Sequence, residues 1–97
     1  MTGDTGSTRI VDPMPVLARF LGIVIMYHRG HGVAHFHAQY GEHWISVEIE
    51  SGEVHGRFPT RALRHVTEWA ELHREELLAN WKLARDGKPV NRIAPLE

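Results

Sequence analysis

The sequence predicts an α+β fold in which an antiparallel sheet of three to four strands packs one of its faces against one long C-terminal helix. Two observations lead to this prediction. Short segments of alternating apolar and polar residues, separated by glycine-containing turns, occupy residues 35–58, and the hydrophobic period becomes that of a helix after Pro59. A length of 97 residues leaves room for a single domain, and 42% apolar and 24% charged residues are ordinary values for a globular protein.

The first third of the chain divides into an extension, a strand and a loop. Residues 1–13 are rich in Gly, Thr and Asp and have little to bury, so we expect a flexible extension before a single α+β domain over residues 14–97. Residues 16–27 contain β-branched and aromatic side chains and no proline, which predicts a strand that is buried on both faces of the sheet. The next segment, HRGHGVA, predicts a loop that contains His28 and His31.

Two dipeptides predict tight hairpin turns. Gly41 with Glu42, and Ser51 with Gly52, are typical of two-residue loops between antiparallel strands. If both turns form, one side of the sheet is apolar and packs on the core, with the pairs Phe36–Val47, Ala38–Ile45, Ile45–Phe58, Val47–Gly56 and Ile49–Val54. Alternation then places two rows of polar side chains on the other side, His35–Glu48–His55 and His37–Ser46–Arg57.

We expect one long helix over residues 61–85, with Thr60 as a candidate cap and with a glycine and a proline that end it. Its apolar residues fall on one stripe that includes Leu77 and Trp81. The helix would be about 37 Å long, whereas a six-residue strand spans roughly 20 Å, so the sheet cannot cover the whole stripe. Either the helix kinks, or the C-terminal tail over residues 90–96 folds back over the uncovered part of the stripe, or another subunit covers it. We expect the tail and a partner, either a small protein or a second copy of the chain, to cover Leu77 and Trp81 together.

The polar side of the predicted sheet carries residues that could do chemistry. His35 and His37 are two residues apart, so alternation puts both imidazoles on one side, about 7 Å apart along the backbone. In a metal-independent ribonuclease these histidines would act as acid and base. Arg57 would hold the phosphate. Glu48 and His55 are further candidate catalytic residues beside the two histidines, since a carboxylate next to a histidine orients its ring and raises its pKa.

Two other interpretations of the same side stay open. His35, His37 and either His55 or Glu48 could bind zinc or nickel in a metal-binding regulator. A solvated sheet face would also be polar, because alternation alone demands it. The sequence therefore leaves open whether the chain is an enzyme. If the chain is a metal-independent ribonuclease, it needs no cofactor. If it is a metal-binding regulator, it would bind zinc or nickel.

Arg57, Arg61 and Arg64 cluster where the sheet meets the helix. Guanidinium groups at a helix amino terminus suit phosphate, so these arginines are candidates for binding a phosphate-bearing substrate such as RNA, and they could equally pair with acidic groups of a partner. The net charge of −1 argues against a strongly basic surface, and the lack of cysteine excludes disulfides and thiolate sites. The longest apolar run, residues 21–27, is too short to span a membrane. With no signal-peptide pattern, we expect a cytoplasmic protein without a membrane partner.

Four segments carry a resemblance to a known family. They are MPVLARFLGIVIMYH at 14–28, AHFHAQYGE at 34–42, I-x-x-G-E at 49–53 and RALRHVTEWAELHREELLANW at 61–81. Over essentially everything after the extension, the chain resembles the small prokaryotic proteins of the domain of unknown function 4160 family. It departs from them at RGHGVA, where members often carry Asp or Asn and prolines. The resemblance also implies that Met14 corresponds to the usual start of the family.

The resemblance implies a function only through gene order. Genes of this family commonly neighbour another small gene, in an arrangement similar to toxin–antitoxin pairs. Together with the uncovered helix stripe, this predicts a cytoplasmic interaction module that is one component of a toxin–antitoxin-like two-gene system. Such a module would bind a partner protein, with RNA or phosphate as a further ligand.

Overall fold

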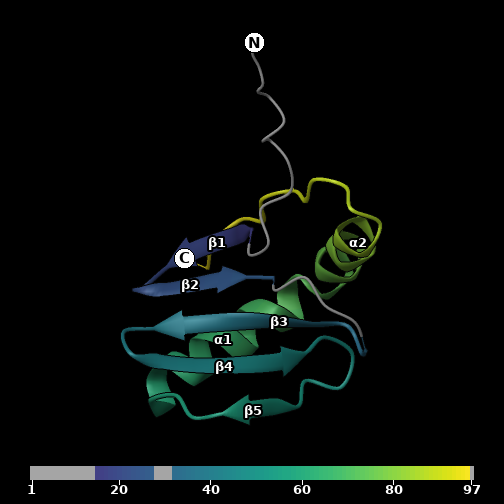
Figure 1. Cartoon of the computed structure of the whole chain (residues 1–97). Coiled ribbons are helices and arrows are strands. Elements are labelled where there is room, and N and C mark those ends of the chain that lie inside the picture. Colours follow the sequence, from purple (N-terminus) through teal and green to yellow (C-terminus); the bar gives the residue numbers. More distant parts are fainter. Residues whose placement is uncertain (1–14, 28–31, 97) are drawn as a thin grey trace.

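The computed structural model describes residues 15–27 and 32–96 (Figure 1). This part of the chain forms a five-stranded antiparallel sheet and two helices, and the strands lie side by side in the order in which they occur in the chain. Each strand therefore pairs with its neighbours in sequence. The elements are, in order, β1 (Val16–Phe20), β2 (Ile23–Met26), β3 (His35–Tyr40), β4 (His43–Glu48), β5 (Val54–Gly56), α1 (Thr60–Leu72) and α2 (Arg74–Arg85).

The α+β class is confirmed, but the predicted sheet of three to four strands is wrong, because residues 16–27 form two strands and not one. The turn between β1 and β2 consists of Leu21 and Gly22, which have positive φ values of 52° and 81°. Two consecutive residues of this kind give the chain the twist that a tight hairpin needs. Leucine rarely adopts this conformation. For that reason the apolar run did not predict a turn.

The hairpin of β3 and β4 has the predicted register. Ala38 pairs with Ile45 and Phe36 with Val47, around the predicted two-residue turn at 41–42. All four side chains are buried in the apolar cluster that forms the core. The alternation of apolar and polar residues therefore assigns the two sides of this hairpin correctly.

The hairpin of β4 and β5 is shifted by two residues from the predicted register, since Val54 pairs with Val47 instead of Ile49. The loop has four residues, 49–52, and not two. Ile49 remains fixed beside the start of β3, because its backbone amide donates to the carbonyl oxygen of Ala34 at 3.0 Å and its side chain is buried. A shift of two keeps side chains on their predicted side but moves them to other rows. The predicted pairs Ile49–Val54, Val47–Gly56 and Ile45–Phe58 are therefore wrong.

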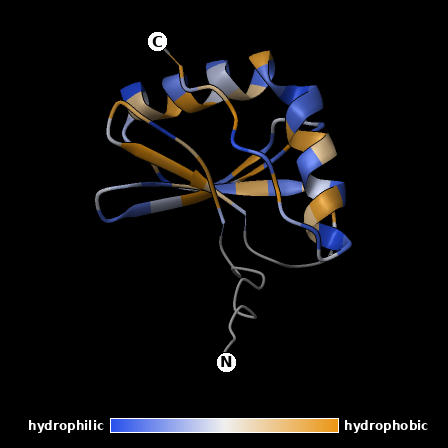
Figure 2. Cartoon of the chain, turned by 90° about the horizontal axis from the view of Figure 1, so that it is seen from above, coloured by the Kyte–Doolittle hydropathy of each residue, from blue (hydrophilic) through white to orange (hydrophobic). Residues whose placement is uncertain are grey.

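The prediction of a single helix over residues 61–85 is wrong. The chain forms two helices that are separated at His73, where φ is −117° and ψ is 25°. α1 packs across one side of the sheet, and α2 turns past the end of the strands (Figures 1 and 2). A straight helix of this length would extend beyond the sheet and leave its apolar stripe uncovered, which is the physical reason for the break. The helix begins at Thr60 after Pro59 in the cap position, so Thr60 is not the cap.

The C-terminal tail folds back over the core, as predicted. The amide of Ile93 donates to the carbonyl oxygen of Leu17 in β1 at 2.9 Å, and the indole Nε1 of Trp69 donates to the carbonyl oxygen of Ala94 at 2.8 Å. Ile93 is buried in the same apolar cluster as the stripe of α2. The tail thus covers the part of the stripe that the sheet does not reach.

Two sequence predictions concern residues outside the described part of the chain: the flexible extension over residues 1–13 and the loop histidines His28 and His31. Within the described part, no helix is both long and apolar enough to cross a membrane. The buried residues of α1, Ala62, Val66 and Trp69, belong to the apolar core cluster.

Candidate functional site

The side of the sheet opposite α1, called the open face below, carries the residues with chemical potential. Figure 1 views the molecule from this side, with α1 behind the strands. Strand pairing aligns the side chains of this face in rows that run from strand to strand. The rows are His35–Glu48–Glu53, Met26–His37–Ser46–His55 and Arg19–Val24–Gln39–Trp44.

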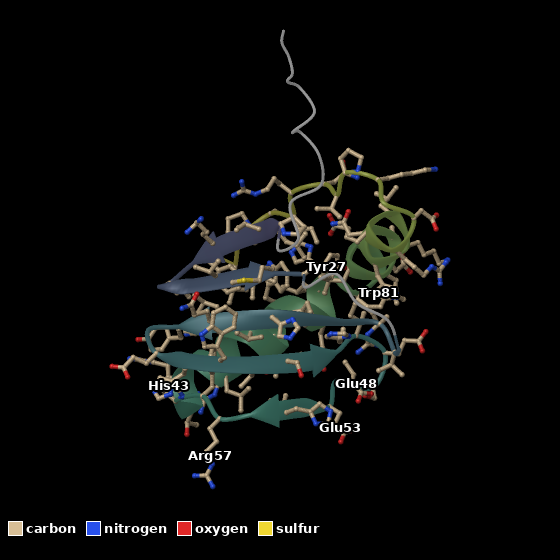
Figure 3. The ribbon with its side chains drawn as sticks, in the orientation of Figure 1. Tyr27, His43, Glu48, Glu53, Arg57 and Trp81 are labelled. Carbon is tan, nitrogen blue, oxygen red and sulfur yellow. The ribbon has the colours of Figure 1, made fainter. Side chains whose placement is uncertain are left out.

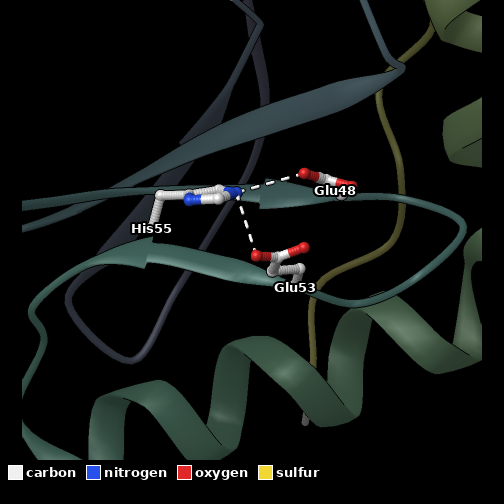
Figure 4. Close-up of side chains that lie close together, drawn as sticks. All are labelled: Glu48, Glu53 and His55. Atoms are coloured by element: carbon white, nitrogen blue, oxygen red, sulfur yellow. Dashed lines mark hydrogen bonds and ion pairs between the residues drawn. The ribbon is translucent and has the colours of Figure 1, made fainter.

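Glu48, Glu53 and His55 form a close group at the β4–β5 hairpin (Figure 4). Nε2 of His55 lies 3.1 Å from Oε2 of Glu48 and 3.8 Å from Oε2 of Glu53. Ser51 supports the group, because its hydroxyl donates to Oε1 of Glu48 and accepts from the amide of Glu53, both at 3.1 Å. The hydrogen bond from His55, followed by the one from Ser51, holds the pKa of Glu48 below its ordinary value.

This group offers one nitrogen and two oxygens to a single point. Its three ligand atoms all lie within 4.8 Å of one another. Of the residues predicted as metal ligands, His55 and the alternative ligand Glu48 belong to it, whereas His35 and His37 do not. In the observed register Glu53 lies opposite Glu48, and His55 lies in the adjacent row, opposite Ser46.

His35 and His37 lie side by side on β3, with their ring centres 5.2 Å apart. Nδ1 of His35 donates to the carbonyl oxygen of Val33 at 2.8 Å, and its ring packs against Trp81 of α2 at 5.1 Å. These contacts orient the ring and leave Nε2 as the nitrogen that can accept a proton or bind a ligand. The two histidines therefore share the open face, as the sequence predicts.

Arg57 does not join the histidines. It follows β5, is exposed, and extends away from the sheet at the opposite end of β5 from Glu53 (Figure 3). In the observed register, the row of His37 continues to His55 and not to Arg57. The predicted group of histidines with a phosphate-binding guanidinium is therefore not assembled.

The predicted phosphate site at the start of α1 keeps its three arginines at the surface. Arg57, Arg61 and Arg64 are exposed, and the first turn of α1 contains no acidic residue. Free backbone amides and positive charge at a helix amino terminus suit an anion. Phosphate or RNA binding by these arginines stays a prediction.

The predicted partner-binding residues Leu77 and Trp81 lie inside the protein. Leu77 is fully buried and Trp81 is only 7% exposed. The hydroxyl of Tyr27 donates to the carbonyl oxygen of Leu77, and the Tyr27 ring meets Trp81 edge-on with ring centres 5.8 Å apart. Burial raises the pKa of Tyr27 well above its ordinary value. Since the chain covers this part of the stripe itself, these two side chains offer a partner little free surface.

Several exposed apolar side chains of the described chain gather at one end of the sheet. Leu21, Tyr40 and Trp44 are 57%, 36% and 44% exposed, and we call these three the exposed apolar end. Tyr40 pairs with Ile23, directly after the β1–β2 turn, and with His43, directly after the β3–β4 turn, so both turns lie at this end. Trp44 lies on the open face, whereas Tyr40 lies on the side of α1, where its ring centre is 6.0 Å from that of Phe58. Exposed apolar side chains at one end of a sheet are candidates for an interaction surface.

Two of these features are not predicted from the sequence. Glu53 belongs to none of the predicted sites, because a two-residue turn at Ser51 and Gly52 would place Glu53 opposite Glu50. A four-residue loop, in which the amide of Gly52 donates to the carbonyl oxygen of Glu48, is the arrangement that brings Glu53 to Glu48. Trp44 is predicted only as a neighbour of Gln39, since alternation identifies the side of a residue but not its exposure.

Comparison with known proteins identifies one family model that matches the chain. The family model described as domain of unknown function (DUF4160) matches residues 22–82, more than half of the chain. The matched range extends from the β1–β2 turn into α2, so it includes Glu48, Glu53 and His55. No curated protein and no solved structure matches the chain.

Proposed function

This chain belongs to the family described as domain of unknown function DUF4160, and from that premise we propose that it is a protein-interaction module, one component of a toxin–antitoxin-like two-gene system. In this proposal the open face and the exposed apolar end bind a small partner protein that the neighbouring gene encodes. The arginines at the start of α1 are the place where RNA or phosphate binds as a further ligand.

One observation carries the proposal: α1 covers one side of the sheet, whereas the other side presents the indole of Trp44, which is 44% exposed. Tryptophan, tyrosine and arginine are the residues that most often dominate the binding energy of protein interfaces. Leu21 and Tyr40 are further exposed apolar residues at the same end of the sheet. The polar rows of the open face adjoin it, which matches the polar rim of a typical interface.

The ribonuclease alternative draws less support from the geometry. A phosphodiester needs a cationic group beside the acid and the base to stabilise the charge that develops. Arg57, the residue predicted for this role, extends away from the sheet (Figure 3). His35 and His37 thus have the spacing for acid–base catalysis, but Arg57 does not lie beside them to hold a phosphate.

Co-expression of the chain with its neighbouring gene product, followed by size-exclusion chromatography with mass detection, tests the proposed function. We expect a complex of defined stoichiometry. Trp44→Ala should weaken this complex about 30-fold, because an aromatic side chain at the centre of an interface contributes roughly 2 kcal/mol. The Tm of the isolated variant should change by less than about 3 °C, because a half-exposed side chain contributes little to the core.

Leu72→Ala is the matched control, since Leu72 is also a large exposed apolar residue, 67% exposed, but is the last residue of α1. This variant should bind the partner as the wild type does. A chain that remains monomeric in the presence of the neighbouring gene product would contradict the proposal. So would equal binding by Trp44→Ala and wild type.

A further inference from the structure

The β4–β5 hairpin brings three potential metal ligands together on the open face. Glu48 ends β4, Glu53 precedes β5 and His55 lies within β5, so two neighbouring strands and their loop supply all three. Figure 4 shows the imidazole of His55 directed toward both carboxylates. The side chains are 26%, 62% and 52% exposed in the same order, so an ion can reach them from solvent.

The separations between these atoms match those of a metal centre. Zinc binds imidazole nitrogen and carboxylate oxygen at about 2.0–2.2 Å, so two ligands of a tetrahedral site lie about 3.3 Å apart. The distances from Nε2 of His55 to Oε2 of Glu48 and of Glu53, 3.1 and 3.8 Å, lie on either side of that value. Small rotations of exposed side chains would equalise them.

The electrostatics of the group also favour a cation. Two carboxylates and one imidazole carry a net negative charge whether or not the ring is protonated. The amide of Glu48 donates to the carbonyl oxygen of Glu53 at 2.9 Å, so the two glutamates are cross-strand partners, a position in which like charges repel. In the described chain both carboxylates have His55 as their ion-pair partner. A bound cation would remove the repulsion between them.

Ser51 holds one ligand in position. Its hydroxyl donates to Oε1 of Glu48, which leaves Oε2, the oxygen nearer His55, as the ligand atom. A hydrogen bond to the non-ligating oxygen of a carboxylate is a common supporting contact around protein metal ions.

We propose that Glu48, Glu53 and His55 bind a first-row divalent transition-metal ion, for which zinc is the best match. One nitrogen and two carboxylate oxygens suit zinc, whereas calcium and magnesium prefer oxygen ligands alone. Three protein ligands leave the remaining position to water or to a group of another molecule. This site shares only His55 with the predicted set of three histidines, and it does not depend on the proposed interaction.

Calorimetric titration of the full chain, purified without a histidine tag, with zinc chloride tests this site. We expect one zinc ion per chain at the tightest site and a rise in Tm on saturation. Glu53→Gln and His55→Gln should each weaken zinc binding at least about tenfold, as the loss of a metal ligand or its support does. Both side chains are more than half exposed, so these variants should fold as the wild type does.

Two control variants separate this site from the alternatives. Glu50→Gln changes an exposed glutamate in the same loop and should leave zinc affinity unchanged. His37→Gln removes a ligand of the predicted histidine set and should also leave it unchanged. Zinc binding that is lost in His37→Gln but kept in Glu53→Gln, or that none of the variants alters, would overturn the proposal. In the wild-type chain, zinc should shift the ring NMR signals that disappear in His55→Gln, and unshifted signals would also overturn it.

Discussion

Leu21 and Gly56 show how single backbone positions shape this sheet. Leu21 has a φ of 52° and is the non-glycine residue of the described chain with positive φ. At Gly56, where φ is 111°, an added Cβ atom would lie 2.7 Å from the carbonyl oxygen of Trp44. At both positions the backbone decides which residues fit, and a hydrophobic pattern does not reveal such a requirement.

Leu21→Asn should stabilise the protein by about 1 kcal/mol, because asparagine tolerates positive φ better than leucine and is favoured in this turn. The side chain of Leu21 is 57% exposed, so its removal costs little burial. The expected rise in Tm is roughly 4–8 °C for a domain of this size. Thermal denaturation measures it, and Leu21→Val, which is β-branched, should lower the Tm. A lower Tm for Leu21→Asn would show that the leucine packs more than its exposure indicates.

Gly56→Ala should destabilise the protein more than Gly52→Ala. Both glycines have positive φ, 111° and 79°, but a Cβ at Gly52 meets nothing within 4 Å, whereas at Gly56 it meets backbone atoms of β4. Backbone strain alone should cost roughly 1 kcal/mol at Gly52, and the clash should add about 1–3 kcal/mol at Gly56. Urea denaturation of both variants gives the comparison. Equal losses would mean that β5 moves freely away from β4.

At the scale of elements, α2 depends on contacts that hold it at an angle to α1. The helix break lies at His73, whose ring packs against Trp69 with centres 5.4 Å apart and whose Nδ1 lies 2.5 Å from the carboxylate of Glu76. Further along α2, the side chain of Asn80 is buried and bonds to the backbone of Asn91 in the tail, at 2.8 and 2.9 Å. One buried amide thus joins α2 to the tail that covers it.

Asn80→Ala should destabilise the protein by about 2–3 kcal/mol, because it removes two buried hydrogen bonds and leaves the backbone groups of Asn91 without their partners. Protease sensitivity of the tail should rise as well. Asn91→Ala is the control, since Asn91 takes part through its backbone alone and should cost less than about 0.5 kcal/mol. Urea denaturation measures both. Similar losses for the two variants would contradict this role of Asn80.

At the scale of the whole molecule, the packing decides which surface is left for a partner. α1 covers one side of the sheet, α2 passes the end of the strands, and the tail bonds to Leu17 in the edge strand β1. Leu77 and Trp81, which are predicted to contact a partner, are instead buried in the core of the chain itself. The open face and the exposed apolar end are the surfaces that this arrangement leaves accessible.

The sequence by itself determined the α+β class, the register of β3 with β4 and the sidedness of His35, His37, Glu48 and His55. These follow from alternation and from the short turn at 41–42, which act between residues close in the chain. Only the tertiary structure decided the turn at Leu21, the two-residue shift of β5 and the break at His73. The turn at Leu21 requires a positive φ, which leucine rarely adopts. The shift and the break depend on which distant side chains share the core, because Ile49 is buried with its amide bonded to Ala34, and α2 packs against Tyr27 and the tail. Local preferences give way there because burying those side chains stabilises the chain more than an ideal turn or a straight helix would.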